Sequence, residues 1–315
     1  MTQPQQAFTL PPGAPSIDQM IAAEQRRARK RLWTALAFMA PAILFVTVFL
    51  LLPVLFNVYA AMTQWAKFSG IDQFAGFANY QRLASNPKFL DATLNTVIWV
   101  AVSFALPATV GLSLAMLVRG VPGEETFKSI FFLPRMFSAT AVGVVWYYVY
   151  AGDGIINSGL RAIGLGDLAS RWLYETHLAT PAMIVTHIWQ QVGLMMVLLL
   201  IGLNALPSDP MEAAKVDGAS RGQVFRHIVL PLLMPTLIMV TTVSVLAGFT
   251  SFDLVWVMGR DFPNRSTLTL SVYQYWESFR AGSWAYGAAI AVVLGIIAMS
   301  ISWSLGALQH RLDKR

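Results

Sequence analysis

Apolar residues dominate six long stretches of the chain, and none of these stretches contains Asp, Glu, Lys or Arg. They cover residues 32–66, 92–118, 136–152, 176–208, 228–252 and 281–309. A helix needs about 20 apolar residues to cross a bilayer. Five stretches are longer than this. The third is long enough only if a helix begins near Ser129 and includes Arg135, whose side chain can extend to the lipid headgroups.

The pattern therefore predicts an all-α membrane protein with six transmembrane helices. We expect them near residues 33–58, 92–118, 129–151, 179–204, 232–258 and 284–308. Several contain proline, which removes a backbone hydrogen bond and permits a kink. These prolines are Pro41, Pro53, Pro107, Pro134 and Pro235. Such prolines are common in membrane helices. They would also suit a helix bundle that flexes, and their positions alone do not separate the two interpretations.

The segments outside these helices suggest three regions. Residues 1–31 are expected to be a cytoplasmic tail, with a Gln- and Pro-rich disordered part (1–15) and a short basic helix capped by Ser16. Residues 32–310 form the transmembrane domain, and residues 311–315 form a C-terminal tail. Segments 1–32, 119–129, 205–231 and 309–315 carry most of the 22 Lys and Arg residues, which predicts that both termini are cytoplasmic.

Composition narrows the class of protein further. Charged residues make up only 12% of the chain, against about 25% in soluble domains. The net charge of +6 follows from basic residues that flank membrane spans, so we expect no nucleic-acid partner. The chain has no cysteine, no phosphate-binding G-x-x-x-x-G-K-[ST] loop, no H-E-x-x-H motif and no G-x-S-x-G elbow. We therefore expect no catalytic residues, no metal site and no bound cofactor.

The loop between the fourth and fifth expected helices is patterned. Asp209 is a good N-cap, Pro210 suits the first helical position, and Glu212 stands where a capping box has an acid. Ala213 and Ala214 favour helix. Gly218 is expected to end this helix in a left-handed conformation, Ser220 to cap a second helix, and Pro231 to mark the entry to the fifth span. The result is a compact helix–turn–helix on the cytoplasmic surface, which by itself could also lie idle at the membrane interface.

The same loop resembles the EAA signature of bacterial ABC importer permeases, in which EAA, three residues, G, nine residues and I-x-L-P follow one another. The matching positions, with the neighbouring acid, are Glu212, Ala213, Ala214, Asp217, Gly218, Ile228, Leu230 and Pro231. The resemblance implies a type I importer permease fold and a loop that docks on an ATPase. It also implies a second related permease, two ATPase subunits that bind ATP and Mg²⁺, an extracytoplasmic solute-binding protein, and a place in the bacterial cytoplasmic (inner) membrane.

Other segments resemble the carbohydrate-uptake branch of that family, which includes the maltose and glycerol 3-phosphate permeases. Residues 74–80 match the F-x-G-x-x-N-Y pattern of the first permease of such pairs, and residues 252–258 and 286–289 also follow the branch. The family's Gly-Gly-Pro turn after the fifth helix is replaced by residues 259–263. The resemblance thus implies a sugar or sugar derivative as solute, without naming it.

Polar and aromatic residues within spans are candidates for the solute path, because polar groups are costly against lipid. They are Gln190, Gln191, Thr241, Ser244, Phe252, Asp253 and Trp256. For the two glutamines, a cavity and a helix–helix hydrogen bond are equally favoured. Ser244 suits packing better, and Asp253 suits a cavity or gate. An ion-gradient-driven transporter is the main alternative, but it predicts internal repeats and midplane carboxylates that this sequence does not offer.

Overall fold

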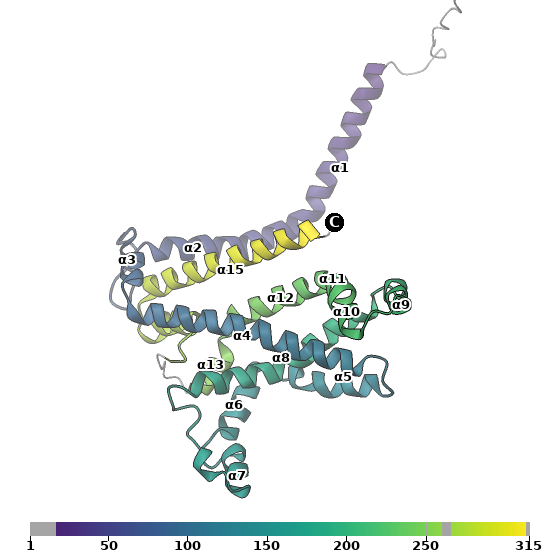
Figure 1. Cartoon of the computed structure of the whole chain (residues 1–315). Helices are drawn as coiled ribbons and strands as arrows, with labels where there is room; N and C mark the ends of the chain where they lie inside the picture. Colours follow the sequence, from purple (N-terminus) through teal and green to yellow (C-terminus); the bar gives the residue numbers. More distant parts are fainter. Residues whose placement is uncertain (1–16, 250, 260–265, 313–315) are drawn as a thin grey trace, which may run out of the picture. The chain divides into compact units, whose positions relative to one another are not determined.

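The computed structural model describes residues 17–249, 251–259 and 266–312, and these are mostly helical (Figure 1). The chain divides into two compact units between Phe56 and Asn57. Residues 1–15, expected to be disordered, and the expected cap Ser16 lie outside the described residues. Five helices are long and apolar enough to span a membrane within the described ranges, and a bent pair makes a sixth if it is counted as one span.

The first long helix runs without the break that the sequence suggested near residue 32. α1 (Ile17–Val46) continues through a π-helical turn, η1 (Thr47–Leu51), into α2 (Leu52–Ala61). The expected division into helices at 16–31 and 33–58 is therefore wrong, because no Gly or Pro lies at the junction near residue 32 where the basic run meets the apolar residues. The π turn lies just before Pro53, whose missing N–H interrupts the regular ladder.

The core of the second unit is the pair α4 (Pro87–Val118) and α8 (Ala179–Asn204), and α12 (Met234–Phe249) packs against α4. Gly111 of α4 lies so close to α8 that a Cβ there would be 2.8 Å from Cβ of Met195. Small residues let membrane helices approach in this way. The bounds of the second and fourth predicted helices agree with α4 and α8 to within a few residues.

The third predicted helix, 129–151, is broken. α5 (Glu124–Phe132) ends in a 3₁₀ turn, η2 (Leu133–Met136), and α6 (Ala139–Val149) leaves at an angle of 92°. Pro134 lies in the 3₁₀ turn, and Phe137 and Ser138 are extended. Ser138 Oγ accepts a hydrogen bond from the backbone N–H of Ala141 at 3.2 Å, which starts α6 as a separate helix.

The fifth predicted helix, 232–258, is also divided. α11 (Leu230–Leu232) leads to α12, and α13 (Asp253–Met258) follows after a gap. Ser251 Oγ donates to the carbonyl of Gly248 at 2.8 Å, so a side chain takes a carbonyl that the helix ladder would otherwise use. The sixth span, α15 (Trp284–Leu312), extends slightly past the predicted 284–308.

Shorter helices occupy the connections on the side opposite the patterned loop. They are α3 (Ala78–Ala84), α7 (Ile155–Ala162), η3 (Gly166–Leu168), α14 (Leu270–Tyr275) and η5 (Trp276–Arg280). The start of α14 is tied to α4, because Asn95 Nδ2 donates to the carbonyl of Leu268 at 3.0 Å and the N–H of Leu270 donates to Thr96 Oγ1 at 2.9 Å.

Candidate coupling loop and solute path

Residues 205–231, here called the coupling loop, form two short helices joined by a tight turn. α9 (Asp209–Val216) has Ser208 at its N-cap and a proline in its first positions. The predicted cap at Asp209 is one residue too late, and Glu212 forms no capping box, because Ser208 makes no side-chain cap hydrogen bond. The backbone N–H of Glu212 instead donates to the carbonyl of Ser208 at 3.0 Å.

The end of α9 follows the prediction at Gly218. Its φ is +78°, in the left-handed region that glycine adopts without a steric penalty. The N–H of Gly218 donates to the carbonyl of Lys215 at 3.1 Å, and the N–H of Ala219 donates to that of Ala214 at 2.9 Å. This pair of bonds is a Schellman motif. A Cβ at Gly218 would meet nothing within 4 Å, so the backbone torsion alone requires glycine here.

The second helix of the coupling loop begins with a complete capping box. Ser220 Oγ accepts from the N–H of Gln223, and Gln223 Oε1 accepts from the N–H of Ser220 at 2.8 Å. This confirms the cap that the sequence predicted at Ser220. α10 (Arg221–Val224) then continues through a π-helical turn, η4 (Phe225–Val229), into α11, which contains Pro231. The loop therefore leads into the fifth span through consecutive helical turns.

Three of the predicted docking residues line one surface cavity of the coupling loop, of about 360 Å³. Its lining residues are Asp217, Gly218, Ala219, Gln223, Val224, His227 and Ile228. Glu212 and Ala213 are exposed on α9 and Ala214 is half-buried. Leu230 is half-buried and Pro231 exposed, both on α11. The cavity is thus lined by the turn at the end of α9 and by the second helix. Glu212, Ala213 and Ala214 are not part of its lining.

Sequence reasoning overlooked Val216. This residue is the last of α9 and its side chain is 88% exposed. A single exposed apolar side chain is common on protein surfaces, and Val216 is of interest only because it lies on the same short helix as Glu212 and Ala213. The available signal was an apolar residue between Lys215 and Asp217 in an otherwise polar segment. Met211, in contrast, packs against the buried cluster at the ends of α4 and α8.

The coupling loop is anchored to the spans by apolar packing. Val229 is 8% exposed and Leu233 is fully buried. Both belong to a cluster with Leu199, Leu200 and Leu203 of α8. A displacement of the loop would therefore be transmitted to α8 and α12 through packed side chains, since close-packed interiors transmit strain.

Most of the polar residues predicted for the solute path form hydrogen bonds to backbone carbonyls inside the bundle. Gln190 is 2% exposed and its Nε2 donates to the carbonyl of Phe137 at 3.0 Å, which ties α8 to the bend of the third span. Gln191 is also buried. Thr241 Oγ1 donates to the carbonyl of Leu237 at 2.6 Å, and Ser244 Oγ donates to that of Val240 at 2.8 Å.

The aromatic candidates, in contrast, form a group. The rings of Phe252 and Trp256 are stacked with centroids 5.7 Å apart, and both contact the ring of Tyr275, at 5.0 and 4.9 Å. Asp253 is exposed in the first turn of α13. Sequence reasoning did not assign Tyr275 to the path, because it comes from a different segment, α14.

Two ionisable residues, Glu277 and Arg280, lie on the neighbouring turn η5. The guanidinium of Arg280 is 5.6 Å from the ring centroid of Trp256, a cation–π distance. Burial raises the pKa of the Glu277 carboxyl, while the positive charges of Arg82 and Lys88 partly oppose this shift. The aromatic group therefore lies beside ionisable side chains rather than in purely apolar surroundings.

This chain is similar to known membrane transport proteins. The family described as "binding-protein-dependent transport system inner membrane component" matches residues 107–315. The chain is 31% identical over 266 residues to the probable ABC transporter permease protein PH1215 of Pyrococcus horikoshii, covering 84% of this chain and 91% of that protein. It is 30% identical over 296 residues to the multiple sugar-binding transport system permease protein MsmF of Streptococcus mutans, covering 92% and 98%.

A solved structure has the same fold. It is a bacterial ABC transporter involved in the import of the acidic polysaccharide alginate. One of its chains superposes with a TM-score of 0.78 at 21% identity, covering 91% of this chain and 99% of that one. This likeness confirms the predicted fold, the all-α fold of a type I importer permease.

The family match covers more than half of the chain, and the relative from Pyrococcus is 31% identical over most of both proteins. The predicted membership of the ABC importer permeases is thereby confirmed. The chain belongs to the binding-protein-dependent transport system inner membrane components and is a membrane-spanning permease subunit rather than an enzyme.

Proposed function

We propose that this permease translocates a sugar or sugar derivative, as one of two related permease subunits in an ATP-driven importer. A relative of 30% identity is named as a multiple sugar-binding transport permease, and the fold is shared with an alginate importer. The solute is delivered by an extracytoplasmic binding protein, a proposal supported by the chain's membership of a family of binding-protein-dependent transport components. Both termini and the coupling loop lie in the cytoplasm.

The coupling loop is the docking site for a separate ATPase subunit. The observation that carries this proposal is the Schellman turn at Gly218, which holds α9 against a capped second helix and leaves Ala213 and Val216 exposed. A short helix of this kind inserts into a groove on its partner. Small alanine side chains allow the two backbones to approach closely, and the exposed valine supplies apolar area for burial.

ATP and Mg²⁺ bind to that partner ATPase and not to this chain. The sequence has no G-x-x-x-x-G-K-[ST] loop with which to hold phosphates. Closure of the ATPase moves the coupling loop, and the packed residues Val229 and Leu233 pass the movement to α8 and α12.

The solute path includes the aromatic group Phe252, Trp256 and Tyr275, with Asp253 at its edge. Aromatic faces pack against the C–H surfaces of sugars, and a carboxylate accepts hydrogen bonds from hydroxyls. Gln191 and Thr241 line the inner part of the path, Ser244 packs against Met195 of α8, and Gln190 acts through the bend that it holds. The second permease supplies the opposite wall.

Replacing Gly218 with valine tests the docking proposal. A β-branched residue disfavours φ of +78°, so the angle between α9 and the second helix changes while the buried core is untouched. We expect ATP-driven uptake to fall at least about tenfold, the effect of roughly 1.4 kcal/mol of lost coupling. Uptake and ATP hydrolysis are measured in proteoliposomes of the assembled transporter.

The matched control is Gly222→Val in the same loop. Gly222 lies in α10 without a positive φ, and a Cβ there also meets nothing within 4 Å. This variant should retain most of the uptake. Equal uptake in Gly218→Val and wild type, at equal membrane levels, would contradict docking through this turn.

Substitution of Asp253 and Gln191 by alanine tests the solute path. If either side chain contacts the solute, its loss leaves hydroxyls of the bound sugar unpaired and raises the solute concentration for half-maximal uptake by about tenfold. Uptake is measured against the concentration of solute-loaded binding protein. Unchanged solute dependence in both variants would remove these residues from the path but leave the docking proposal intact.

A further inference from the structure

A second cavity, of about 220 Å³, lies where the coupling loop meets the ends of two spans. Most of its lining is apolar, and three cationic residues complete it. The lining residues are Met116, Arg119, Leu203, Lys215, Ala219, Arg221, Val224, Phe225 and Val229. Met116 and Arg119 lie at the end of α4 and Leu203 lies at the end of α8, so the cavity sits at the level where two spans terminate.

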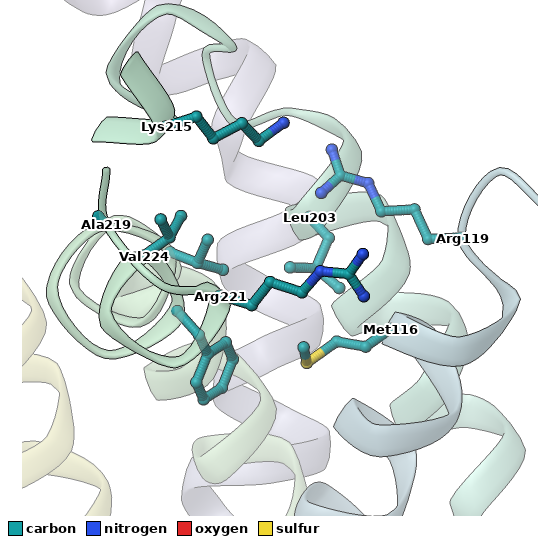
Figure 2. Close-up of a pocket in the computed structure, with 9 residues that line it drawn as sticks. Met116, Arg119, Leu203, Lys215, Ala219, Arg221 and Val224 are labelled. Atoms are coloured by element: carbon teal, nitrogen blue, oxygen red, sulfur yellow. The ribbon is translucent and has the colours of Figure 1, made fainter. Parts of the chain in front are cut away.

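The cationic side chains converge on this cavity from different elements. In Figure 2 the charged ends of Lys215 and Arg119 point toward one another above Leu203, and the guanidinium of Arg221 lies below them, between Leu203 and Met116. Arg119 is held by its Nε, which donates to Asn204 Oδ1 at 3.1 Å. None of the three makes an ion pair with any residue in the described ranges. The mouth of the cavity therefore carries three positive charges without an ion pair in this part of the chain. Glu124 is an acid near Arg119, and its pKa is lowered mainly by its hydrogen bond with Lys128 and in part by the charge of Arg119.

Helix dipoles explain only part of this arrangement. The C-terminal ends of α4 and α8 carry partial negative charge, which favours a nearby cation such as Arg119. Lys215 is favoured in the same way, because it lies in the last turn of α9. Arg221 is not, because it stands at the start of α10, where a cation is unfavourable. Three cations around an apolar cavity thus call for a ligand that combines a negative charge with apolar surface.

An anionic phospholipid has this chemistry, and the cavity lies at the depth of its headgroup. Basic pockets between membrane helices near the cytoplasmic surface bind acidic lipid headgroups, at about 1 kcal/mol for each Lys or Arg. A volume of about 220 Å³ accommodates a phosphate group with its glycerol and first methylenes, but not a whole lipid. The remaining acyl chain would continue along the apolar side of α4, where Met116 and Leu117 are exposed.

We propose that this cavity is a binding site for the headgroup of an anionic phospholipid, which bridges the coupling loop to the end of α4. The lipid phosphate contacts Arg119 on one side and Lys215 and Arg221 on the other. It holds the coupling loop in register with the spans, so the lipid composition of the membrane regulates coupling. The site is independent of which solute is carried.

The test measures lipid bound to the assembled transporter. The complex is reconstituted in nanodiscs that contain phosphatidylglycerol and phosphatidylcholine, extracted into detergent, and analysed for retained lipid by mass spectrometry. We expect Arg221→Gln to reduce retained phosphatidylglycerol about fivefold, and the double variant Arg119→Gln, Arg221→Gln to reduce it further. Uptake by wild type should be higher in phosphatidylglycerol than in phosphatidylcholine alone, and the double variant should lose this difference.

Two further variants separate a seated lipid from general surface attraction. Arg226→Gln removes the same charge from the same loop but outside the cavity, and it should retain phosphatidylglycerol as wild type does. Met116→Trp keeps every charge and fills the cavity, so it should lose the lipid. Equal loss in Arg221→Gln and Arg226→Gln, or full retention in Met116→Trp, would overturn the proposal.

A small anion or the ATPase subunit in this cavity would give different results. If inorganic phosphate displaces phosphatidylglycerol from the wild-type complex as readily as added phosphatidylglycerol does, the cavity binds a small anion and the lipid proposal fails. If the permease pair alone retains the lipid but the complex with its ATPase subunits does not, the ATPase fills the cavity and the proposal also fails.

Discussion

Two glycines of this permease illustrate different physical demands on the same residue type. Gly218 is required by its positive φ, because nothing lies near its missing side chain. Gly193 of α8 is required by space, because a Cβ there would come within 2.8 Å of the backbone N of Phe132 and closer still to the carbonyl of Phe131. The first demand serves the coupling loop, and the second allows the bent third span to contact α8.

Gly193→Ala should therefore destabilise the folded subunit. Backbone cannot move aside as a flexible side chain can, so overpacking of about 1–3 kcal/mol is expected. The measurement is the melting temperature of the purified full chain in detergent. Gly295→Ala in α15 is the matched control, because a Cβ there meets nothing within 4 Å. Equal melting temperatures for wild type and Gly193→Ala would contradict the close contact.

Among the elements, the broken third and fifth spans stand out from the straight helices. α6 leaves η2 at 92° because an extended residue and a side-chain cap separate them. Gln190 then binds the carbonyl of Phe137, which the break has freed from the helix ladder. Before α13, the carbonyl of Gly248 likewise accepts a hydrogen bond from the Ser251 hydroxyl. In both breaks, polar side chains compensate for the missing backbone hydrogen bonds.

Ser138→Ala tests the restart of the third span. Loss of an N-cap typically costs about 1 kcal/mol. The melting temperature of the full chain should fall accordingly. Ser113→Ala in α4 is the comparison, since Ser113 Oγ only donates back to the carbonyl of Thr109 at 2.8 Å within its own helix. A fall no larger in Ser138→Ala than in Ser113→Ala would show that the cap does not define the bend.

At the scale of the whole molecule, the coupling loop and the aromatic group belong to one helical path. The loop enters α12 through η4 and α11, and α13 with Phe252 and Trp256 follows α12. Force applied at one end of this path therefore acts on the same elements that carry the proposed solute contacts.

The proposed topology has a direct test, because the chain contains no cysteine. Single cysteines can be introduced at Arg27 in α1 and at Gln81 in α3, both exposed. With the N-terminus in the cytoplasm, a membrane-impermeant maleimide added to intact cells should label Gln81→Cys and not Arg27→Cys. Labelling of Arg27→Cys before the cells are opened would reverse the topology.

Much of the fold was predictable from local pattern. The fourth span was predicted at 179–204 and α8 has the same bounds, because its charge-free stretch is long and free of internal breaks. The turn at Gly218 and the cap at Ser220 were equally predictable, since each depends on residues within a few positions. The cap at Ser208 was missed because Asp209 is an equally good capping residue by type and directly precedes Pro210, which suits the first helical position.

The remaining features depend on contacts between distant segments. Pro134 permitted a kink, but the size of the bend is set by packing of α5 and α6 against α8. The partner of Gln190 was undecidable in sequence, because a buried amide satisfies either a solute or a backbone carbonyl equally well. Tyr275 joined the aromatic group only because α14 folds back onto α13.

By itself, the sequence determined that this protein crosses the membrane as helices and that the loop 205–231 has a defined turn, and the resemblance of its EAA pattern to importer permeases implied a separate ATPase as the energy source. These follow from hydrophobic length, from the EAA pattern and from backbone torsions, all of which are local. The tertiary structure alone decided where the spans break, which polar groups are already satisfied, and that Arg119 meets Lys215 and Arg221 around one cavity. Such outcomes depend on which distant side chains share a buried space, and no local pattern encodes that.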